Sequence, residues 1–338
     1  MNLDIFLKAL IGILPVLVFL GVLRYMDSYK LVRLQLIFPV FLGGVSAAVF
    51  AYFANGYAIE MLNMEFIDYT RFVSPIIEES LKGLVVVLLF RSNRIGFLVD
   101  GAILGFAVGA GFAMAENMYY LYHAADAHIA IWVVRGFGTA VMHGGVTAIF
   151  AVFAQMMTEQ QSRPRLFLFL PGLLVAAVLH SIFNQFPISP VLSTIATLLL
   201  IPLILMLVYQ KSVTVMHKWL EVDFDANEEI LKKIQAGEFT QSKAGQFLLQ
   251  LRQRFDGLIV ADMLCYIRLH VELAIRAKSV LMAREFDMEI DTDKEIDEKF
   301  KELHALEQSI GKAGFLAMSP YLNMSRKDLW QLFLLEKQ

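Results

Sequence analysis

The sequence predicts an all-α protein: a polytopic membrane helix bundle of about seven transmembrane helices, followed by a helical cytoplasmic C-terminal domain. Hydrophobic residues make up 57% of the 338 residues and charged residues only 18%, which is more apolar than an ordinary soluble chain. Residues 1–209 carry 11 Lys/Arg and 11 Asp/Glu, whereas the 129 residues that follow carry 18 and 21. We therefore predict a transmembrane domain at 1–209 and a soluble helical domain at 210–338.

The membrane helices are predicted from the length of the apolar runs. A helix needs roughly 20 mostly apolar residues to span a bilayer, and seven segments meet this requirement: about 4–23, 34–54, 71–90, 97–120, 129–157, 166–184 and 190–209. Beyond residue 210 the pattern changes to amphipathic helices at 225–236, 240–286 and 291–310. This second part shows no catalytic motif, and we expect it to form homo-oligomers or to regulate the first.

The basic residues predict how the bundle is oriented. Loops 24–33, 91–96 and 158–165 each carry at least two Lys or Arg, whereas the alternate loops 55–70, 123–128 and 185–189 carry none. Because Lys and Arg are enriched in cytoplasmic loops, we expect the N-terminus outside and residues 210–338 in the cytoplasm. The net charge of −3 and the single cysteine argue against a nucleic-acid partner and an intramolecular disulfide.

Several ionisable groups interrupt the apolar helices. Such groups are costly in a membrane and usually mark function. At about 1.5 Å of rise per residue, they all fall in the outer half of the predicted bundle. This convergence on one level predicts a catalytic or metal site, and it involves four helices: Glu78, Glu79 and Lys82 on the third, Glu116 and Asn117 on the fourth, Arg135 and His143 on the fifth, and His180 and Asn184 on the sixth.

Helical spacing predicts some of the contacts. Glu78 and Lys82 are four residues apart and share a face, so we expect them to pair. His180 and Asn184 share a face for the same reason. Arg135 is expected to neutralise a buried carboxylate. Close packing around the fourth helix is predicted by its small residues, namely Gly101, Gly105, Gly109 and Gly111.

The polar residues also form four ordered motifs that resemble those of PrsW-type intramembrane proteases, which belong to the superfamily of CAAX prenyl proteases and bacteriocin-processing proteins. A single EExxK motif would be weak evidence, but the ordered set from about residue 71 to 184 is strong. The relatives usually carry histidine where this chain has Glu116. The motifs are EExxK at 78–82, Phe four residues before Glu-Asn at 112–117, Arg followed by His at 135–143, and His four residues before Asn at 180–184.

The resemblance implies hydrolysis of peptide bonds in membrane-anchored substrates, such as an anti-sigma factor, at the outer side of a bacterial cytoplasmic membrane. Peptide hydrolysis needs an activated water, a proton donor for the leaving amine and stabilisation of the oxyanion. We assign Glu78 as the general base, supported by Glu79. His180 binds metal or polarises the carbonyl, and Asn184 donates a hydrogen bond to the oxyanion. Lys82, Asn117 and Arg135 are assigned structural polar roles.

Two mechanisms and two further functions stay open. Glu116, His143 and His180 have the ligand types of a catalytic Zn²⁺ site, although the HExxH motif is absent; a metal-free water activated by glutamate is the alternative. Buried Glu, His and Arg also occur in transporters and channels, but the sequence shows no evident inverted repeat. A non-catalytic membrane scaffold is the remaining candidate.

Overall fold

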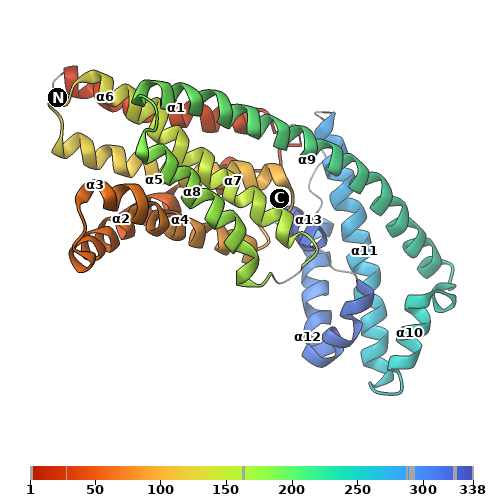
Figure 1. The fold of residues 1–338 in the computed structure, drawn as a ribbon. Coiled ribbons are helices and arrows are strands. Elements are labelled where there is room, and N and C mark those ends of the chain that lie inside the picture. Colours follow the sequence, from red (N-terminus) through yellow and green to blue (C-terminus); the bar gives the residue numbers. More distant parts are fainter. Residues whose placement is uncertain are drawn as a thin grey trace. The chain divides into compact units, whose positions relative to one another are not determined.

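The computed structural model describes residues 3–27, 29–161, 164–286, 288, 294–322 and 326–336. In these residues all regular secondary structure is helical, so the predicted all-α fold is confirmed (Figure 1). The chain forms two compact units, one of Met1–Thr158 with Arg163–Ser212 and one of Glu159–Ser162 with Val213–Gln338. Each unit is described by itself below.

The first unit is a bundle of apolar helices. Six helical stretches are long and apolar enough to cross a membrane. The predicted span at 71–90 corresponds to η1 (Tyr69–Val73) and α4 (Ser74–Arg91), where Glu78, Glu79 and Lys82 lower the hydropathy, so the count of seven spans stays a prediction. The six are α1 (Leu3–Tyr25), α2 (Leu34–Leu62), α5 (Leu98–His123), α6 (Ile129–Val133) continued by η2 (Val134–Thr139) and α7 (Ala140–Thr158), η3 (Leu166–Phe169) with α8 (Leu170–Gln185), and α9 (Pro190–Gln235).

Helix α5 lies at the centre of this bundle. It packs most extensively against α7 and α2, and it is buried on nearly all faces from Val99 to Ala113. Two glycines make this packing possible: a Cβ at Gly109 would collide with the carbonyl of His143 on α7, and a Cβ at Gly111 with the carbonyl of Phe41 on α2. The predicted close packing of the fourth membrane helix therefore brings its polar end directly against α7.

Two π-helical segments precede the helices that carry the site. The segment η1 follows α3 (Phe66–Asp68) and leads into α4, while η2 leads into α7. π-Helical turns are rare and are frequently found at functional sites. Here they carry Tyr69 and Arg135, which lie roughly two helical turns before Glu78 and His143.

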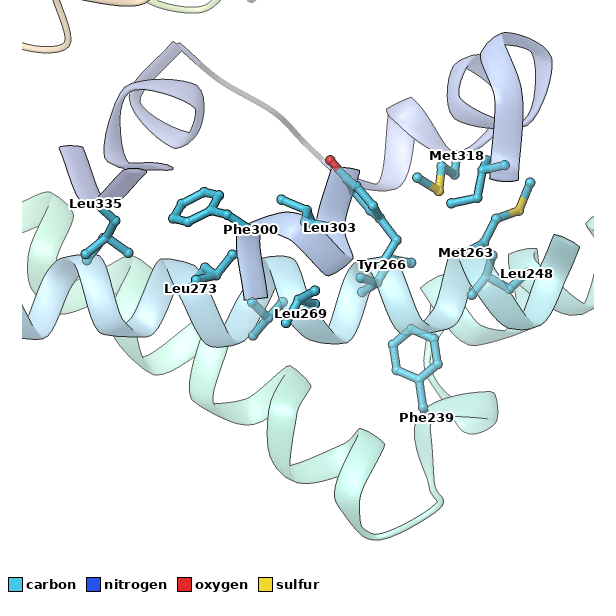
Figure 2. Packing of buried hydrophobic residues seen from close by; sticks show 14 of the residues in the cluster. Phe239, Leu248, Met263, Tyr266, Leu269, Leu273, Phe300, Leu303, Met318 and Leu335 are labelled. Carbon is cyan, nitrogen blue, oxygen red and sulfur yellow. The ribbon is translucent and has the colours of Figure 1, made fainter. Parts of the chain in front are cut away.

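The second unit has its own apolar core, shown in Figure 2. Tyr266, Leu269 and Leu273 on α11 (Gly257–Glu285) pack against Phe300 and Leu303 on α12 (Lys294–Leu322). The unit also contains the end of α9, η4 (Phe239–Gln241), α10 (Lys243–Leu251) and α13 (Arg326–Glu336).

The helices of the second unit differ from the prediction in two places. The predicted single helix at 240–286 is wrong, because the chain breaks between α10 and α11. Asp256 ends the break as an N-cap, its side chain accepting a hydrogen bond from the Leu258 N–H. The predicted helix at 225–236 is the end of α9, which runs without interruption from Pro190 to Gln235. The third begins at Lys294, so its predicted start at 291 lies outside the described residues.

Candidate active site

A buried ion pair on α4 lies at the centre of the site. Lys82 Nζ is 2.5 Å from Glu79 Oε1 and 3.0 Å from His143 Nδ1, and the Lys82 and Glu79 side chains are at most 1% exposed. The predicted pair between Glu78 and Lys82 is therefore wrong. Residues three and four apart both share a helix face, and Lys82 contacts the more deeply buried of its two acidic neighbours.

Glu79 also determines how His180 on α8 is protonated. Its Oε1 lies 2.8 Å from His180 Nδ1. A carboxylate can only accept a hydrogen bond, so in the neutral ring Nδ1 carries the proton and Nε2 holds the lone pair. That Nε2 atom faces Glu78 Oε2 at a distance of 3.9 Å. The structure thus directs the Nε2 lone pair of the neutral ring toward Glu78, the first acid of the EExxK motif.

The opposite tautomer follows for His143 on α7. The Lys82 ammonium can only donate, so His143 Nδ1 accepts from it and Nε2 carries the proton. Nε2 then donates to Glu116 Oε2 on α5 across 3.1 Å. The rings of His143 and His180 meet edge to face with centroids 4.7 Å apart. Helices α4, α5, α7 and α8 are joined through these two rings.

Two side chains outside the sequence-predicted set hold Glu78 directly, and a third holds one of these two. Ser74 donates to Glu78 Oε1 across 2.5 Å, and Asn55 on α2 donates to the same oxygen across 3.3 Å. The Tyr69 hydroxyl in turn donates to Asn55 Oδ1 across 2.8 Å. Spacing could have identified Ser74, which lies four residues before Glu78 on the same helix. Asn55 and Tyr69 reach Glu78 only through tertiary packing, so the sequence carries no local signal for them.

Arg135 and Asn117 form a second polar group beside Glu116. Arg135 Nη2 lies 3.4 Å from Glu116 Oε2, and its Nε donates to Asn117 Oδ1 across 2.9 Å. The guanidinium also stacks over the ring of Tyr120 at 3.7 Å. Asn117 donates to the carbonyl of Gly12 on α1. These contacts have the form expected of an arginine that compensates a carboxylate inside a bundle.

Asn184 ties α8 to the π-helical segment η1. Its Nδ2 donates to the Thr70 carbonyl across 2.9 Å, and the neighbouring Ser181 donates to the Arg71 carbonyl. In this structure one N–H of the predicted oxyanion donor is therefore engaged with the backbone. Its role in stabilising an oxyanion stays a prediction.

A cavity of about 480 Å³ opens beside the site, between α2, η1, α4 and α5. Glu78 and Glu116 both contribute to its wall, together with polar groups of Asn55, Tyr69 and Ser74. The remaining wall is mainly aromatic and aliphatic. Its volume is that of an ordinary ligand pocket, for which about 300–1,000 Å³ is typical.

Within the part of the chain that the structure describes, Glu78, His143 and His180 form a group that could hold a metal ion. Their ligand atoms lie within 4.8 Å of one another, somewhat wider than the roughly 3.4 Å between ligands at zinc bonds of about 2.0–2.1 Å. Glu78 and His180 fit a divalent ion, because Glu79 supplies the carboxylate that usually orients a ligating histidine from behind. His143 could join them only by giving up its contact with Lys82 or with Glu116. In this group Glu78 stands where we predicted Glu116, which instead accepts a hydrogen bond from His143.

Two acids, two histidines and a lysine lie together at one end of an apolar helix bundle, and these are groups of the kind that acid–base hydrolysis uses. Residues 33–209 match the family described as PrsW family intramembrane metalloprotease. The chain therefore belongs to this family, as the four motifs predicted, and it is an integral membrane protease. No curated protein and no solved structure matches the chain.

Proposed function

We propose that this protease hydrolyses peptide bonds of membrane-anchored substrates of the anti-sigma-factor type, using a water molecule activated by Glu78. The observation that carries the proposal is the position of the Glu78 carboxylate. Ser74 and Asn55 hold one of its oxygens, and the other faces the lone pair of His180 Nε2 at 3.9 Å. A water between these two atoms can be held by both at once.

The reaction begins with proton transfer from this water to Glu78. The hydroxide oxygen then bonds to the carbonyl carbon of the substrate, and the carbonyl oxygen takes up the negative charge. Breaking the C–N bond releases the amine, which receives the proton that Glu78 had accepted. The products are a new carboxylic acid and a new amine, between which the remaining proton then distributes. A positioned acid–base group of this kind contributes about 10²–10⁴ to the rate.

The oxyanion needs hydrogen-bond donors, and the site offers two candidates. Asn184 has an amide group on the same helix face as His180, and His143 carries a proton on Nε2. Both donors are engaged in the substrate-free arrangement, with Thr70 and Glu116 respectively. We propose that the substrate carbonyl replaces one of these acceptors.

Glu79 and Lys82 act by positioning. The Lys82 ammonium keeps Glu79 ionised, and Glu79 holds the proton on His180 Nδ1, which leaves Nε2 without one. Neither side chain reaches the cavity, and both are almost completely shielded from solvent. Their role is to maintain the tautomer that the proposed water site requires.

A divalent ion, Zn²⁺ being our candidate, would be held by Glu78, His143 and His180. When bound it would supply Lewis-acid polarisation and a more acidic water. The contact between Lys82 and His143 Nδ1 favours the metal-free arrangement, because an ammonium beside this nitrogen competes with a second cation. If a metal is required, chelation will abolish cleavage and added zinc will restore it; full activity after chelation would rule the metal out.

We propose that the site faces the outer side of a bacterial cytoplasmic membrane. The support is two basic loops: loop 91–96, which joins α4 to α5 at the ends of these helices away from the site, and loop 24–33, which joins α1 to α2. A tag placed after residue 338 should then be inaccessible from outside intact cells. Labelling of that tag in intact cells would contradict this orientation.

Homo-oligomerisation through residues 210–338 is the further part of the proposal. Exposed apolar side chains on its helices support it, with Leu258 77% and Leu316 73% exposed. Native mass spectrometry of the full chain in lipid nanodiscs should give a dimer or higher oligomer. A monomer at all concentrations would contradict it.

The experiment for the proteolytic function uses the purified chain in nanodiscs and a pool of synthetic single-span peptides, with products identified by mass spectrometry. Glu78→Gln and His180→Ala should each abolish product formation. Glu60→Gln is the matched control, because Glu60 is an exposed glutamate near the end of α2 outside the site. Equal product from Glu78→Gln and the wild type would contradict the proposed base.

A further inference from the structure

The cavity between α2 and α5 has the composition of a pocket for an apolar side chain. Its wall is formed by small residues on one side, including Ala48 and Ala51 of α2. The rest of the wall includes aromatic rings from α2, α3 and α5, namely Tyr52, Phe53, Phe66, Phe112, Tyr119 and Tyr120. Aromatic and small apolar walls together bind large flat or branched hydrophobic groups.

The cavity is continuous with the reactive groups. Glu78 and Glu116 line it directly, whereas His143 and His180 lie behind these two acids. A group bound in the cavity therefore lies next to the proposed base and not at a remote surface. This placement distinguishes the cavity from an ordinary lipid-filled groove, because carboxylates are costly in contact with lipid chains.

A membrane substrate must unwind before it can be cleaved. In a helix every interior carbonyl is hydrogen-bonded to an N–H four residues later, so it is closed to attack. Unwinding in an apolar environment leaves polar backbone groups that need new partners. Asn55, Tyr69 and Ser74 provide such groups in the cavity wall, and the apolar remainder can receive a side chain.

We propose that this cavity is the specificity pocket of the protease, and that it binds one large apolar side chain of the unwound substrate next to the scissile bond. The proposal rests on the proteolytic function proposed above. According to this proposal, the size of the cavity decides which substrate side chains fit. Residues such as Gly56 and Tyr119, which take no part in the chemistry, set that size.

Gly56 offers a direct way to change that size. It lines the cavity on α2, and a Cβ added at this position meets no atom within 4 Å. Gly56→Leu should therefore fill part of the cavity without disturbing the helix packing. Gly21 on α1 provides the matched control, because it is also an exposed helical glycine with open space around its Cβ but lies outside the cavity.

The test uses single-span Leu/Ala peptides interrupted by Gly-Xaa-Gly, with Xaa being Gly, Ala, Leu or Phe. Binding is measured by fluorescence anisotropy of labelled peptide against Glu78→Gln protein in nanodiscs, and cleavage is measured with the Glu78-containing protein. A hydrophobic pocket discriminates by at least about tenfold for each well-fitted group. The Phe and Leu peptides should bind at least about tenfold more tightly than the Gly peptide.

Gly56→Leu should abolish this preference while leaving the Gly peptide unchanged, and Gly21→Leu should retain it. Tyr119→Ala, which enlarges the same cavity, is the second variant and should strengthen binding of a Trp peptide relative to Leu. Melting curves establish that each variant is folded. If Gly56→Leu does not fold, the Tyr119→Ala result decides.

The outcomes separate the pocket from the proteolytic function. Equal binding of all peptides, binding of none, or equal effects of Gly56→Leu and Gly21→Leu would overturn the pocket, even if the protein cleaves peptides. Displacement of bound peptide by phospholipid acyl chains with loss of side-chain preference would also overturn it. Size-selective binding without any cleavage would support the pocket and contradict the proteolytic function.

Discussion

Replacing Lys82 by methionine should destabilise the membrane unit strongly. The side chain is 0% exposed, and its ammonium lies 2.5 Å from Glu79 Oε1 and 3.0 Å from His143 Nδ1. Methionine retains most of the apolar stem but leaves Glu79 as a buried carboxylate without its cation. Removal of one partner from a buried ion pair costs about 3–5 kcal/mol.

For a unit of roughly 200 residues this cost corresponds to a fall of roughly 10 °C in melting temperature, at about 2–4 °C per kcal/mol. The assay follows monodisperse protein in detergent during heating. Lys233→Met is the control, because Lys233 forms an ion pair of the same length with Glu229 on an exposed helix face. This control should leave the melting temperature unchanged, since exposed pairs contribute little.

The double variant Glu79→Gln with Lys82→Met distinguishes charge pairing from lost packing. If the two side chains stabilise one another as an ion pair, the double variant should be less destabilised than the sum of the two single variants. Strictly additive effects, or a Lys82→Met variant that melts with the wild type, would refute the assignment of Lys82 as the cation that holds Glu79 ionised.

Three further predictions follow from particular contacts. Tyr69→Phe removes the hydroxyl that holds Asn55, which in turn holds the proposed base Glu78. Loss of one hydrogen bond costs roughly 1 kcal/mol, so kcat should fall by about fivefold with KM unchanged. An unchanged kcat would contradict this. Gly109→Ala places a methyl group against the His143 carbonyl and should reduce the yield of folded protein. Size-exclusion chromatography measures this yield, and a normal yield with normal activity would argue against the tight packing of α5 on α7. Burial and Lys278 lower the pKa of His270 in the second unit to about 4, so the unfolded chain binds a proton between about pH 6.5 and 4 that the folded chain does not. Stability of that unit should fall over this range as the pH drops, by up to about 3 kcal/mol, and His270→Gln should remove this part of the dependence in hydrogen-exchange measurements on α11.

The positions of the membrane helices could be predicted because an apolar run of sufficient length has few alternatives in a bilayer. The four motifs also identified which helices carry the polar groups. Their pairing could not be predicted, because it depends on how each helix is rotated about its axis. Lys82 has acidic neighbours both three and four residues before it, and only the packing of α7 and α8 decides that it contacts Glu79.

The contacts of Glu78 show the same limit. Ser74 lies on the same helix and is within reach of spacing rules, whereas Asn55 arrives from α2 and Tyr69 from η1. In the second unit the break before α11 had a local signal, since Asp256 precedes Gly257 as an N-cap followed by a flexible residue. The continuous amphipathic pattern around it concealed that signal.

The most direct test of the account is the rate of peptide-bond cleavage by Glu78→Gln beside that of Glu60→Gln in nanodiscs, with the single-span peptides as substrates. The account predicts a loss of about 10²–10⁴-fold for Glu78→Gln and no more than a twofold change for Glu60→Gln, with both variants folded. Cleavage by Glu78→Gln at the wild-type rate would contradict the central claim that this carboxylate activates the water.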